Sequence, residues 1–249
     1  MEQIIYKQVY PEASLAYYVD SFWMLESNPD AGTEVVVLPD GRIDLFFSLS
    51  ATEPFHVTLL GLGTRPEAAM IEAGTRTFAV SFNLPAAAYL FPDVLIQMKD
   101  GVKLLPDDLW EYDAGCLEDF DAFCKRTTAR LQSLLPEETD SRKRQLFELL
   151  YAAHGGLTVR ELSERAFWSA RQINRYFKQQ FGLTLKAYSN ILRFRAAFSH
   201  IHEGKLFPEG DFTDQPHFIK EVRKFSGVSP KELYRNHNGR FIQFSTLEP

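Results

Sequence analysis

Residues 157–198 read LTVRELSERAFWSARQINRYFKQQFGLTLKAYSNILRFRAAF, which has the spacing of three helices joined by two tight turns. The first helix is expected over about Val159–Ala166, because Thr158 and Glu161 are placed to form a capping box at its start. The second helix is expected to open at Ser169, whose hydroxyl can accept from the free backbone N–H groups of the first turn. The pattern therefore predicts a short helix, a turn and a second helix.

The second of these helices is amphipathic, and it is expected to stop at Gly182, a residue suited to the left-handed C-terminal position. Its inward residues, at helical spacing, are Ile173, Tyr176, Phe177 and Phe181. The residues left outward on its first two turns are Ala170, Arg171, Gln172, Asn174, Arg175 and Lys178. Such basic and amide side chains pair with base edges or phosphate oxygens, so the segment predicts a helix-turn-helix. On spacing alone, an ordinary helical hairpin with a solvated face fits equally well.

The charge of the chain is divided unevenly between its two halves, although the whole carries only −6. Residues 1–140 hold 9 Lys and Arg against 23 Asp and Glu, a balance of −14. Residues 141–249 hold 18 against 10, a balance of +8. A polyanion would be attracted to the second half and repelled by the first, which favours a nucleic-acid-binding half joined to a different module.

Two motifs in the basic half resemble those of the AraC family of bacterial transcription regulators. The first is the run Leu162, Ser169-x-Arg171-x-Ile173-x-Arg175-x-Phe177-Lys178, Phe181-Gly182, Arg193 and Ala197. The second is Phe212-Thr-Asp214-Gln215-Pro-His217-Phe218 followed by Phe225-x-Gly227-Val-Ser229-Pro230. The resemblance covers about the last hundred residues and implies two helix-turn-helix units. The run VVVLPDGRIDLFFSL is similar, less distinctively, to the sensor half of an uncharacterised subset of the family.

The first 110 residues indicate mainly short strands and turns. The β-rich runs are Leu15–Leu25, Glu34–Leu38, Ile43–Leu49, His56–Leu60 and Thr77–Leu84. The turn residues Pro39-Asp40-Gly41 between two apolar runs predict a β-hairpin. Strands at this spacing favour a small barrel or sandwich.

A helix is expected near residues 117–135, with apolar residues at helical spacing along one side. In the AraC family such a linker helix often mediates dimerisation, but packing against the β-rich module explains the pattern as well. The polar run Pro136–Asp140 breaks the pattern and marks a domain boundary. We therefore expect residues 1–135 to form an all-β or α+β module that senses a ligand or holds a dimer. Residues 141–240 are expected to form an all-α DNA-binding domain whose second helix-turn-helix is truncated.

Three features depart from the family pattern. Phe167 occupies a turn position that is usually glycine, although its side chain disfavours positive φ. The interval Phe198–Gly210 is too short for a full leading helix of the second motif, and Asp211 takes the corresponding turn position. The helix that follows is intact, with Thr213 expected as its N-cap. DNA contact by the second motif is therefore less firmly supported than contact by the first.

The expected function is that of a sequence-specific DNA-binding transcription regulator that responds to a small molecule. The DNA-contacting candidates are Arg171, Gln172, Asn174, Arg175, Lys178, Arg193, Gln215, His217, Lys220 and Lys224. The ligand-binding candidates on the N-terminal module are Trp23, Arg42, Asp44, Phe46 and Phe82. Core aromatics and solvated hairpin residues are the simpler account of this second set. Double-stranded DNA is the expected partner, together with a small-molecule effector, a second copy of the chain and RNA polymerase.

No catalytic, metal or cofactor site is expected. The six histidines are scattered, and the chain has neither a dinucleotide fingerprint nor an apolar run long enough to span a membrane. Cys116 and Cys124 lie about two turns apart in an expected helical region, too far for a disulfide, so a reducing cytoplasm is the natural setting.

Two alternatives remain open. In one, a degenerate motif no longer reads DNA, and the chain acts by binding other proteins. In the other, the chain is a DNA-repair protein with a methyl-accepting cysteine, which would need an activated thiol.

Overall fold

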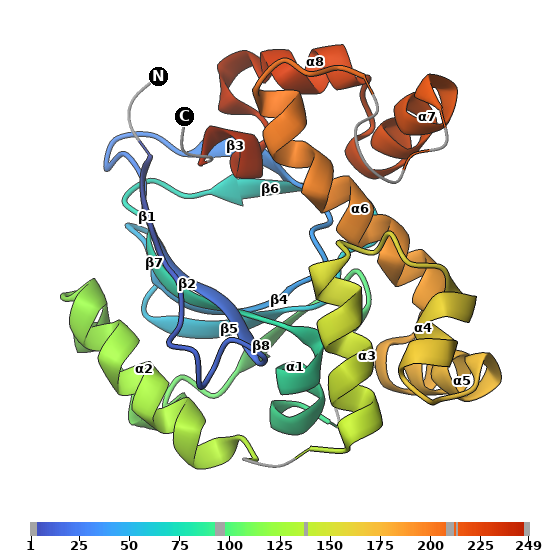
Figure 1. Cartoon of the computed structure of the whole chain (residues 1–249). Coiled ribbons are helices and arrows are strands. Elements are labelled where there is room, and N and C mark those ends of the chain that lie inside the picture. Colours follow the sequence, from blue (N-terminus) through green and yellow to red (C-terminus); the bar gives the residue numbers. More distant parts are fainter. Residues whose placement is uncertain (1–3, 93–97, 137–138, 208–211, 213, 247–249) are drawn as a thin grey trace. The chain divides into compact units, whose positions relative to one another are not determined.

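The computed structural model describes residues 4–92, 98–136, 139–207, 212 and 214–246 (Figure 1). The chain divides into two compact units. The N-terminal unit comprises Met1–Glu34, Arg42–Leu62 and Ala69–Glu137, and the C-terminal unit comprises Val35–Gly41, Gly63–Ala68 and Glu138–Pro249. The C-terminal unit therefore includes two short segments from the first 70 residues. The domain bounds expected from the sequence, 1–135 and 141–240, place both segments in the N-terminal module.

The N-terminal unit is built on a six-stranded antiparallel sheet in the order β1-β2-β7-β4-β5-β8. Its strands are β1 (Ile5–Val9), β2 (Val19–Glu26), β4 (Ile43–Leu49), β5 (His56–Leu60), β7 (Arg76–Phe82) and β8 (Val102–Leu105). Strands β3 (Thr33–Val37) and β6 (Glu67–Ile71) form a separate two-stranded sheet. The helical elements of this part are α1 (Leu84–Leu90), η2 (Leu109–Glu111), η3 (Ala114–Leu117) and α2 (Phe120–Leu134).

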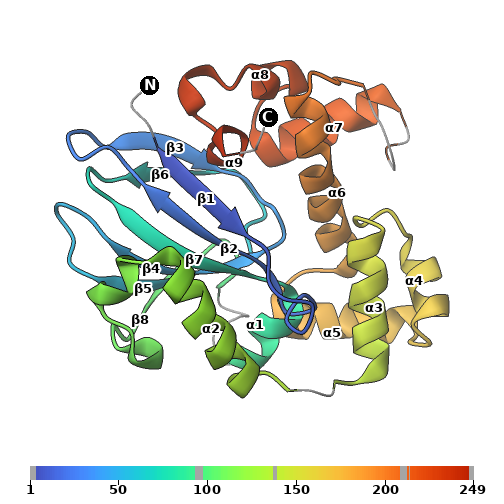
Figure 2. The ribbon, with the colours of Figure 1, turned by 60° about the vertical axis from the view of Figure 1, so that its left-hand side comes forward.

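The two faces of the six-stranded sheet differ in composition. Side chains alternate between faces along a strand, and residues directly opposite each other on paired strands share a face. The core face carries residues such as Phe47 and Phe78, and α2 covers it: the ring of Phe123 lies 5.5 Å from each of these two rings (Figures 1 and 2). The second face carries Trp23 and Phe46. We call it the aromatic–polar face.

The C-terminal unit is helical. Its helices are α3 (Ser141–Ala152), α4 (Val159–Arg165), α5 (Ala170–Phe181), α6 (Leu185–His202), α7 (Gln215–Ser226), α8 (Pro230–Arg235), η4 (His237–Gly239) and α9 (Ile242–Ser245). The fold class is therefore the expected one, an antiparallel β region with added helices followed by an all-α region. Among the described residues, no helix is both long enough and apolar enough to cross a membrane.

Helix α6 is the central element of the C-terminal unit. Its first half packs with α3 and α5 around Phe177, whose ring lies 5.7 Å from that of Phe147 and 5.8 Å from that of Tyr188. Gly155 (φ +75°) lies so close to α6 that a Cβ there would come within 2.3 Å of the Ser189 carbonyl oxygen, so only glycine fits. The second half of α6 packs on α7, and the ring of Phe194 stacks 5.3 Å from that of Phe225.

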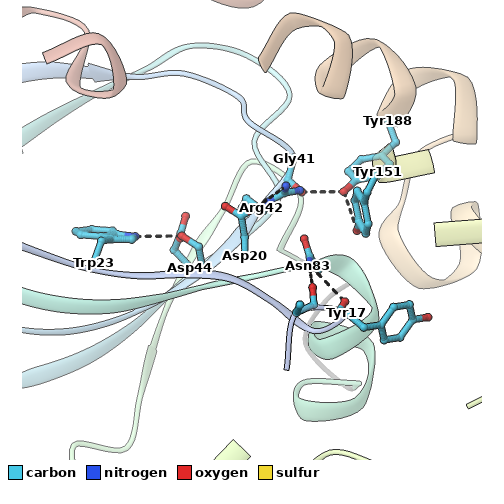
Figure 3. Close-up of polar contacts among 11 residues, drawn as sticks. Tyr17, Asp20, Trp23, Gly41, Arg42, Asp44, Asn83, Tyr151 and Tyr188 are labelled. Atoms are coloured by element: carbon cyan, nitrogen blue, oxygen red, sulfur yellow. Dashed lines mark hydrogen bonds and ion pairs between the residues drawn. The ribbon is translucent and has the colours of Figure 1, made fainter. Parts of the chain in front are cut away.

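This second core is completed by residues from the chain's N-terminal region. Val36 and Leu38 are buried in the same cluster as Phe241 and Phe244. The backbone of Leu38 both donates to and accepts from the side-chain amide of Gln243, at 3.0 and 2.9 Å. We call the segment 35–41 the strap. At its end the Tyr188 hydroxyl donates to the Gly41 carbonyl at 2.9 Å (Figure 3).

The strap shows that the predicted hairpin at Pro39–Gly41 is wrong. Strand β3 pairs with β6, whereas β4 pairs with β5 and β7. Gly41 does have the positive φ of a turn glycine, +83°, but the chain turns there to leave one sheet and enter another. The apolar residues before the turn are buried in a helical core, so their alternation reflects that packing and not a cross-strand partner.

Candidate nucleic-acid interface and ligand face

Helices α4 and α5 form the helix-turn-helix that the sequence predicts. Thr158 and Glu161 make the predicted capping box at the start of α4, and Ser169 and Gln172 make a second one at the start of α5. Helix α5 ends at Gly182 in the left-handed conformation, with φ 70°. These caps fix where each helix begins and ends, and they satisfy backbone groups that would otherwise lack partners.

The turn between α4 and α5 contains a strained residue. Phe167 has φ +51°, a conformation that an L-residue with a large side chain rarely adopts. The residue is 81% exposed, so packing of its side chain does not offset that strain. The neighbouring Trp168 instead packs inward, with its ring centroid 5.2 Å from that of Tyr176.

The solvent side of α5 is cationic. Arg171, Arg175 and Lys178 are all exposed, whereas Ile173 and Phe177 hold the opposite side in the core. The exposed residues lie at successive helical turns along one side of the helix, as in a helix that enters a groove. Figures 1 and 2 show α5 at one end of α6 and α7 toward its other end.

Three residues expected at this interface are engaged within the protein. The side-chain oxygen of Gln172 accepts from the backbone N–H of Ser169 at 3.3 Å. Asn174 is half-buried: its amide donates to the Ala170 carbonyl at 3.0 Å and its oxygen accepts from the Leu185 backbone N–H at 3.4 Å. Asn174 therefore joins α5 to α6 and does not point outward as expected. Arg193 donates to the Asn190 side chain one turn earlier on α6.

Helix α7 presents a second polar surface. Its N-cap is Asp214, whose carboxylate accepts from the backbone N–H of His217 at 2.8 Å; the expected cap, Thr213, lies outside the described residues. The exposed polar residues of α7 are Gln215, Lys220, Arg223 and Lys224. His217 is half-buried and its ring lies 6.0 Å from that of Phe212. Gly227, with φ 77°, ends this helix as Gly182 ends α5.

Among the described residues between α6 and α7, no further helix precedes α7. Between α6 and α7 the structure describes residues 203–207, 212 and 214, and none of these is helical. Asp211, the expected turn residue, lies outside the described residues. Helix α7 is held instead by its own apolar side, where Phe218, Val222 and Phe225 are buried against α6.

The ligand candidates of the N-terminal unit are only partly brought together. Trp23 donates from its indole N–H to the Ser81 hydroxyl at 3.0 Å, and Ser81 donates in turn to the carboxylate of Asp44 (Figure 3). The ring of Phe46 lies 5.3 Å from that of Trp23. Ser81 was not among the sequence candidates, because only the register β2–β7–β4 shows that it lies between Trp23 and Asp44.

The other two candidates are Phe82 and Arg42, and only Arg42 shares the face of Trp23. Phe82 belongs to the core face: it pairs with Ile43, is fully buried, and its ring contacts that of Phe91. The expectation that Phe82 lines a ligand site is therefore wrong, because strand alternation places it on the opposite side from Trp23. Arg42 is 7% exposed and forms an ion pair with Asp20 at 2.7 Å, so its charge is balanced inside the protein.

The two cysteines lie in separate elements, Cys116 in η3 and Cys124 in α2, and both are free thiols. The expected single helical region is thus two elements. Burial raises the pKa of Cys116 to about 12 and that of Cys124 to about 11, so both remain protonated at neutral pH. Within the described part of the chain, no three histidine, cysteine or acidic residues gather as a metal site.

Comparisons with known proteins give a family of undefined role and one group of similar structures. Residues 7–101 match the family described as Domain of unknown function (DUF6597), over less than half of the chain. Among solved structures, ToxT from Vibrio cholerae is similar with a TM-score of 0.42 and 9% identity, covering 93% of this chain and 97% of ToxT. Unsaturated-fatty-acid-bound ToxT from strain SCE256 gives a TM-score of 0.41 and 11% identity, covering 97% and 94%. Comparison with curated proteins finds no match. At these TM-scores the likeness decides nothing about function, which must rest on the geometry above.

Proposed function

We propose that this protein is a sequence-specific DNA-binding transcription regulator whose N-terminal unit responds to a small molecule. The observation that carries the proposal is the α4–α5 helix-turn-helix. A helix capped at both ends and anchored by Ile173 and Phe177 presents Arg171, Arg175 and Lys178 to solvent, in the half of the chain that carries +8. A helical hairpin whose polar side only faces water would not need an excess of basic residues on that side.

In the proposed complex α5 enters one major groove, and α7 enters the next. The N-terminal part of a recognition helix approaches the base edges, so Arg171 and Arg175 contact bases while Lys178 contacts phosphate. On α7, Gln215 faces bases and Lys220 and Lys224 face phosphates. Helix α6 has 18 residues and is about 27 Å long. That length, with α5 and α7 toward its two ends, suits grooves about 34 Å apart.

Gln172, Asn174, Arg193 and His217 have secondary roles in this proposal. Asn174 holds α5 against α6, so its loss would act on stability and not on base choice. Gln172 keeps its amide N–H₂ for DNA while its oxygen serves the cap. A homodimer formed through α2 and a contact with RNA polymerase remain predictions, and neither is needed for α5 to bind a duplex.

The proposal is tested by equilibrium binding of the full chain to random-sequence duplexes and to duplexes selected from them, at two salt concentrations. Binding that weakens steeply with salt and prefers the selected duplexes is expected. Arg171→Ala should weaken selected-duplex binding by about 1–3 kcal/mol if the guanidinium reads a base. Lys125→Ala, which removes an exposed cation from α2, is the matched control and should change little.

The alternative of a protein-interaction role predicts a different result. If the chain binds no duplex at low salt, and Arg171→Ala has no effect on any DNA, the regulator proposal is rejected. Two exposed aromatic residues, Phe167 and Phe207, are the feature that would then need a partner. The methyl-acceptor alternative is disfavoured by the raised pKa of both thiols, because the thiolate is the nucleophile.

A further inference from the structure

The buried residues of the aromatic–polar face, which we call its floor, have an unusual composition for a sheet face. Five of these buried residues are small, and all five but Ala79 are polar: Ser21, Ser48, Thr77, Ala79 and Ser81. Leu25, which pairs with Thr77, is also buried on this face and is apolar. Ser48 and Thr77 hydrogen-bond to each other across strands at 2.8 Å. A face that serves only to fill a core is apolar, as the core face is. Small polar residues beneath a few large aromatic ones are instead typical of a ligand site, where shape and a few polar groups set specificity.

Aromatic rings stand above this floor on adjacent strands. Trp23, Ala79 and Phe46 are consecutive partners across β2, β7 and β4. Because the middle residue is alanine, the two flanking rings meet over it at 5.3 Å and an interplanar angle of 68°. The ring of Tyr6 on β1 lies 6.1 Å beyond Trp23. Trp23, Phe46 and Tyr6 are each half-buried, so part of each ring remains accessible.

The charge on this face is negative. Asp44 lies one row away from the rings and is linked to Trp23 through Ser81. Among the described residues in or directly next to the strands, the basic side chains on this side are Arg42, whose ion pair with Asp20 balances its charge, and His56, whose ring contacts the Pro54 carbonyl. The cations Lys7, Arg76 and Lys103 pair with core-face residues of neighbouring strands, so alternation places them on the opposite face.

We propose that the aromatic–polar face binds a small organic cation, with its ammonium group over the ring faces of Trp23 and Phe46 and its charge countered by Asp44. Aromatic rings attract a desolvated cation through their quadrupole, and a nearby carboxylate strengthens that attraction. The −14 balance of residues 1–140 draws cations toward this half and repels anions. The inference rests on the proposed function because it assigns a chemical class to the effector of the N-terminal unit.

The chemistry separates this proposal from the ligand seen in one similar structure, an unsaturated fatty acid bound to ToxT. The carboxylate of a fatty acid placed on this face would meet Asp44 and find Arg42 already paired. An organic ammonium ion gains from both the rings and the carboxylate. The two ligands differ in the sign of their charge, so binding measurements with ligands of matched shape and different charge can distinguish between them.

Calorimetric titration of the full chain without DNA gives the direct test. The probes are choline, benzyltrimethylammonium, the uncharged carbon isostere of choline, 3,3-dimethylbutan-1-ol, and oleate. We expect at least one of the two cations to bind, and choline to bind at least about tenfold more tightly than its isostere. Absence of binding by both cations, equal binding of choline and its isostere, or binding of oleate in preference to both cations would overturn the proposal.

Two substitutions locate the site. Asp44→Asn should weaken cation binding by about tenfold or more, and Trp23→Phe should weaken it by less. Asp121→Asn, the same change on the exposed side of α2, is the matched control and should leave binding unaltered. Retention of full affinity in a folded Asp44→Asn variant would contradict the assignment. Because no DNA is present, failure here leaves the proposed DNA binding intact, and failure of DNA binding leaves this result interpretable.

Discussion

At the scale of single residues, Phe167 stands out because its backbone and its side chain are both unfavourably placed. It has φ +51° in the turn between α4 and α5, and its ring is largely exposed. Replacement by glycine should raise the free energy of unfolding by about 1 kcal/mol. The left-handed conformation costs an L-residue about 1–2 kcal/mol, and glycine removes that strain. The greater entropy of glycine in the unfolded chain offsets part of this gain. Thermal and urea unfolding of the full chain would measure the change.

The Phe167→Ala variant separates strain from exposure. Alanine removes the exposed ring but keeps a Cβ at positive φ, so it should gain much less than glycine. If alanine and glycine stabilise the protein equally, the backbone strain inferred for this turn is not the cause. If Phe167→Gly leaves stability unchanged but weakens DNA or protein binding, the ring has a contact role instead.

The two cysteines give a second prediction at this scale. Desolvation raises the pKa of Cys116 to about 12 and that of Cys124 to about 11, so the reactive thiolate is scarce near neutral pH. We expect alkylation of both thiols by iodoacetamide at pH 7.5 to be much slower in the folded chain than in the urea-unfolded chain. Mass spectrometry of timed samples would follow it. Rapid modification of either thiol in the folded protein would reopen the methyl-acceptor interpretation.

At the scale of elements, the sequence predicts local features well and long-range ones poorly. The bounds of α4 and α5 follow from caps and helical spacing, because Thr158, Ser169 and Gly182 act within one helical turn of their own positions. Strands β4 and β5 have the predicted bounds, whereas β1, β6 and β8 were missed because each is short and largely exposed. The register that unites Trp23, Ser81 and Asp44 joins residues up to 58 positions apart, which no local pattern encodes.

The strap is the element whose role most differs from the predicted hairpin, and it provides the third prediction. Leu38 is 2% exposed and belongs to the core formed by α6 to α9. Leu38→Ala should therefore lower the unfolding free energy of the C-terminal unit by about 2–5 kcal/mol. Hydrogen exchange would report it as reduced protection of amides in α6 and α7, although the substitution lies about 150 residues earlier in the sequence.

The neighbouring Val37 gives the matched control for the strap. It is half-buried and, by strand alternation, faces away from Leu38, so Val37→Ala should cost less than about 1 kcal/mol. Gln243→Ala should fall between the two, because it leaves the backbone N–H and carbonyl of Leu38 without their side-chain partner. If Leu38→Ala loosens only N-terminal amides, the strap does not belong to the C-terminal core as the structure indicates.

At the scale of the whole molecule, the uneven division of charge determines how DNA binding should depend on salt. The exposed cations of the two helices proposed to contact DNA are Arg171, Arg175 and Lys178 on α5, and Lys220, Arg223 and Lys224 on α7. The proposed phosphate contacts among them are Lys178, Lys220 and Lys224, so log K should fall against log salt concentration with a slope of about −3, from about −0.9 per phosphate. If only α5 binds, Lys178 is the remaining phosphate contact and the slope should be about −1.

Lys220→Gln decides between these two cases, because it removes one cation from α7 and none from α5. If α7 lies in a groove, the slope should become shallower by about one unit, and affinity should fall similarly for selected and random duplexes, as expected for a phosphate contact. Lys125→Gln removes an equal charge from α2 and should leave the slope unaltered. Fluorescence anisotropy between about 50 and 200 mM salt would measure both. An unchanged slope for Lys220→Gln, alongside a shallower one for Lys178→Gln, would mean that α7 folds but does not bind DNA.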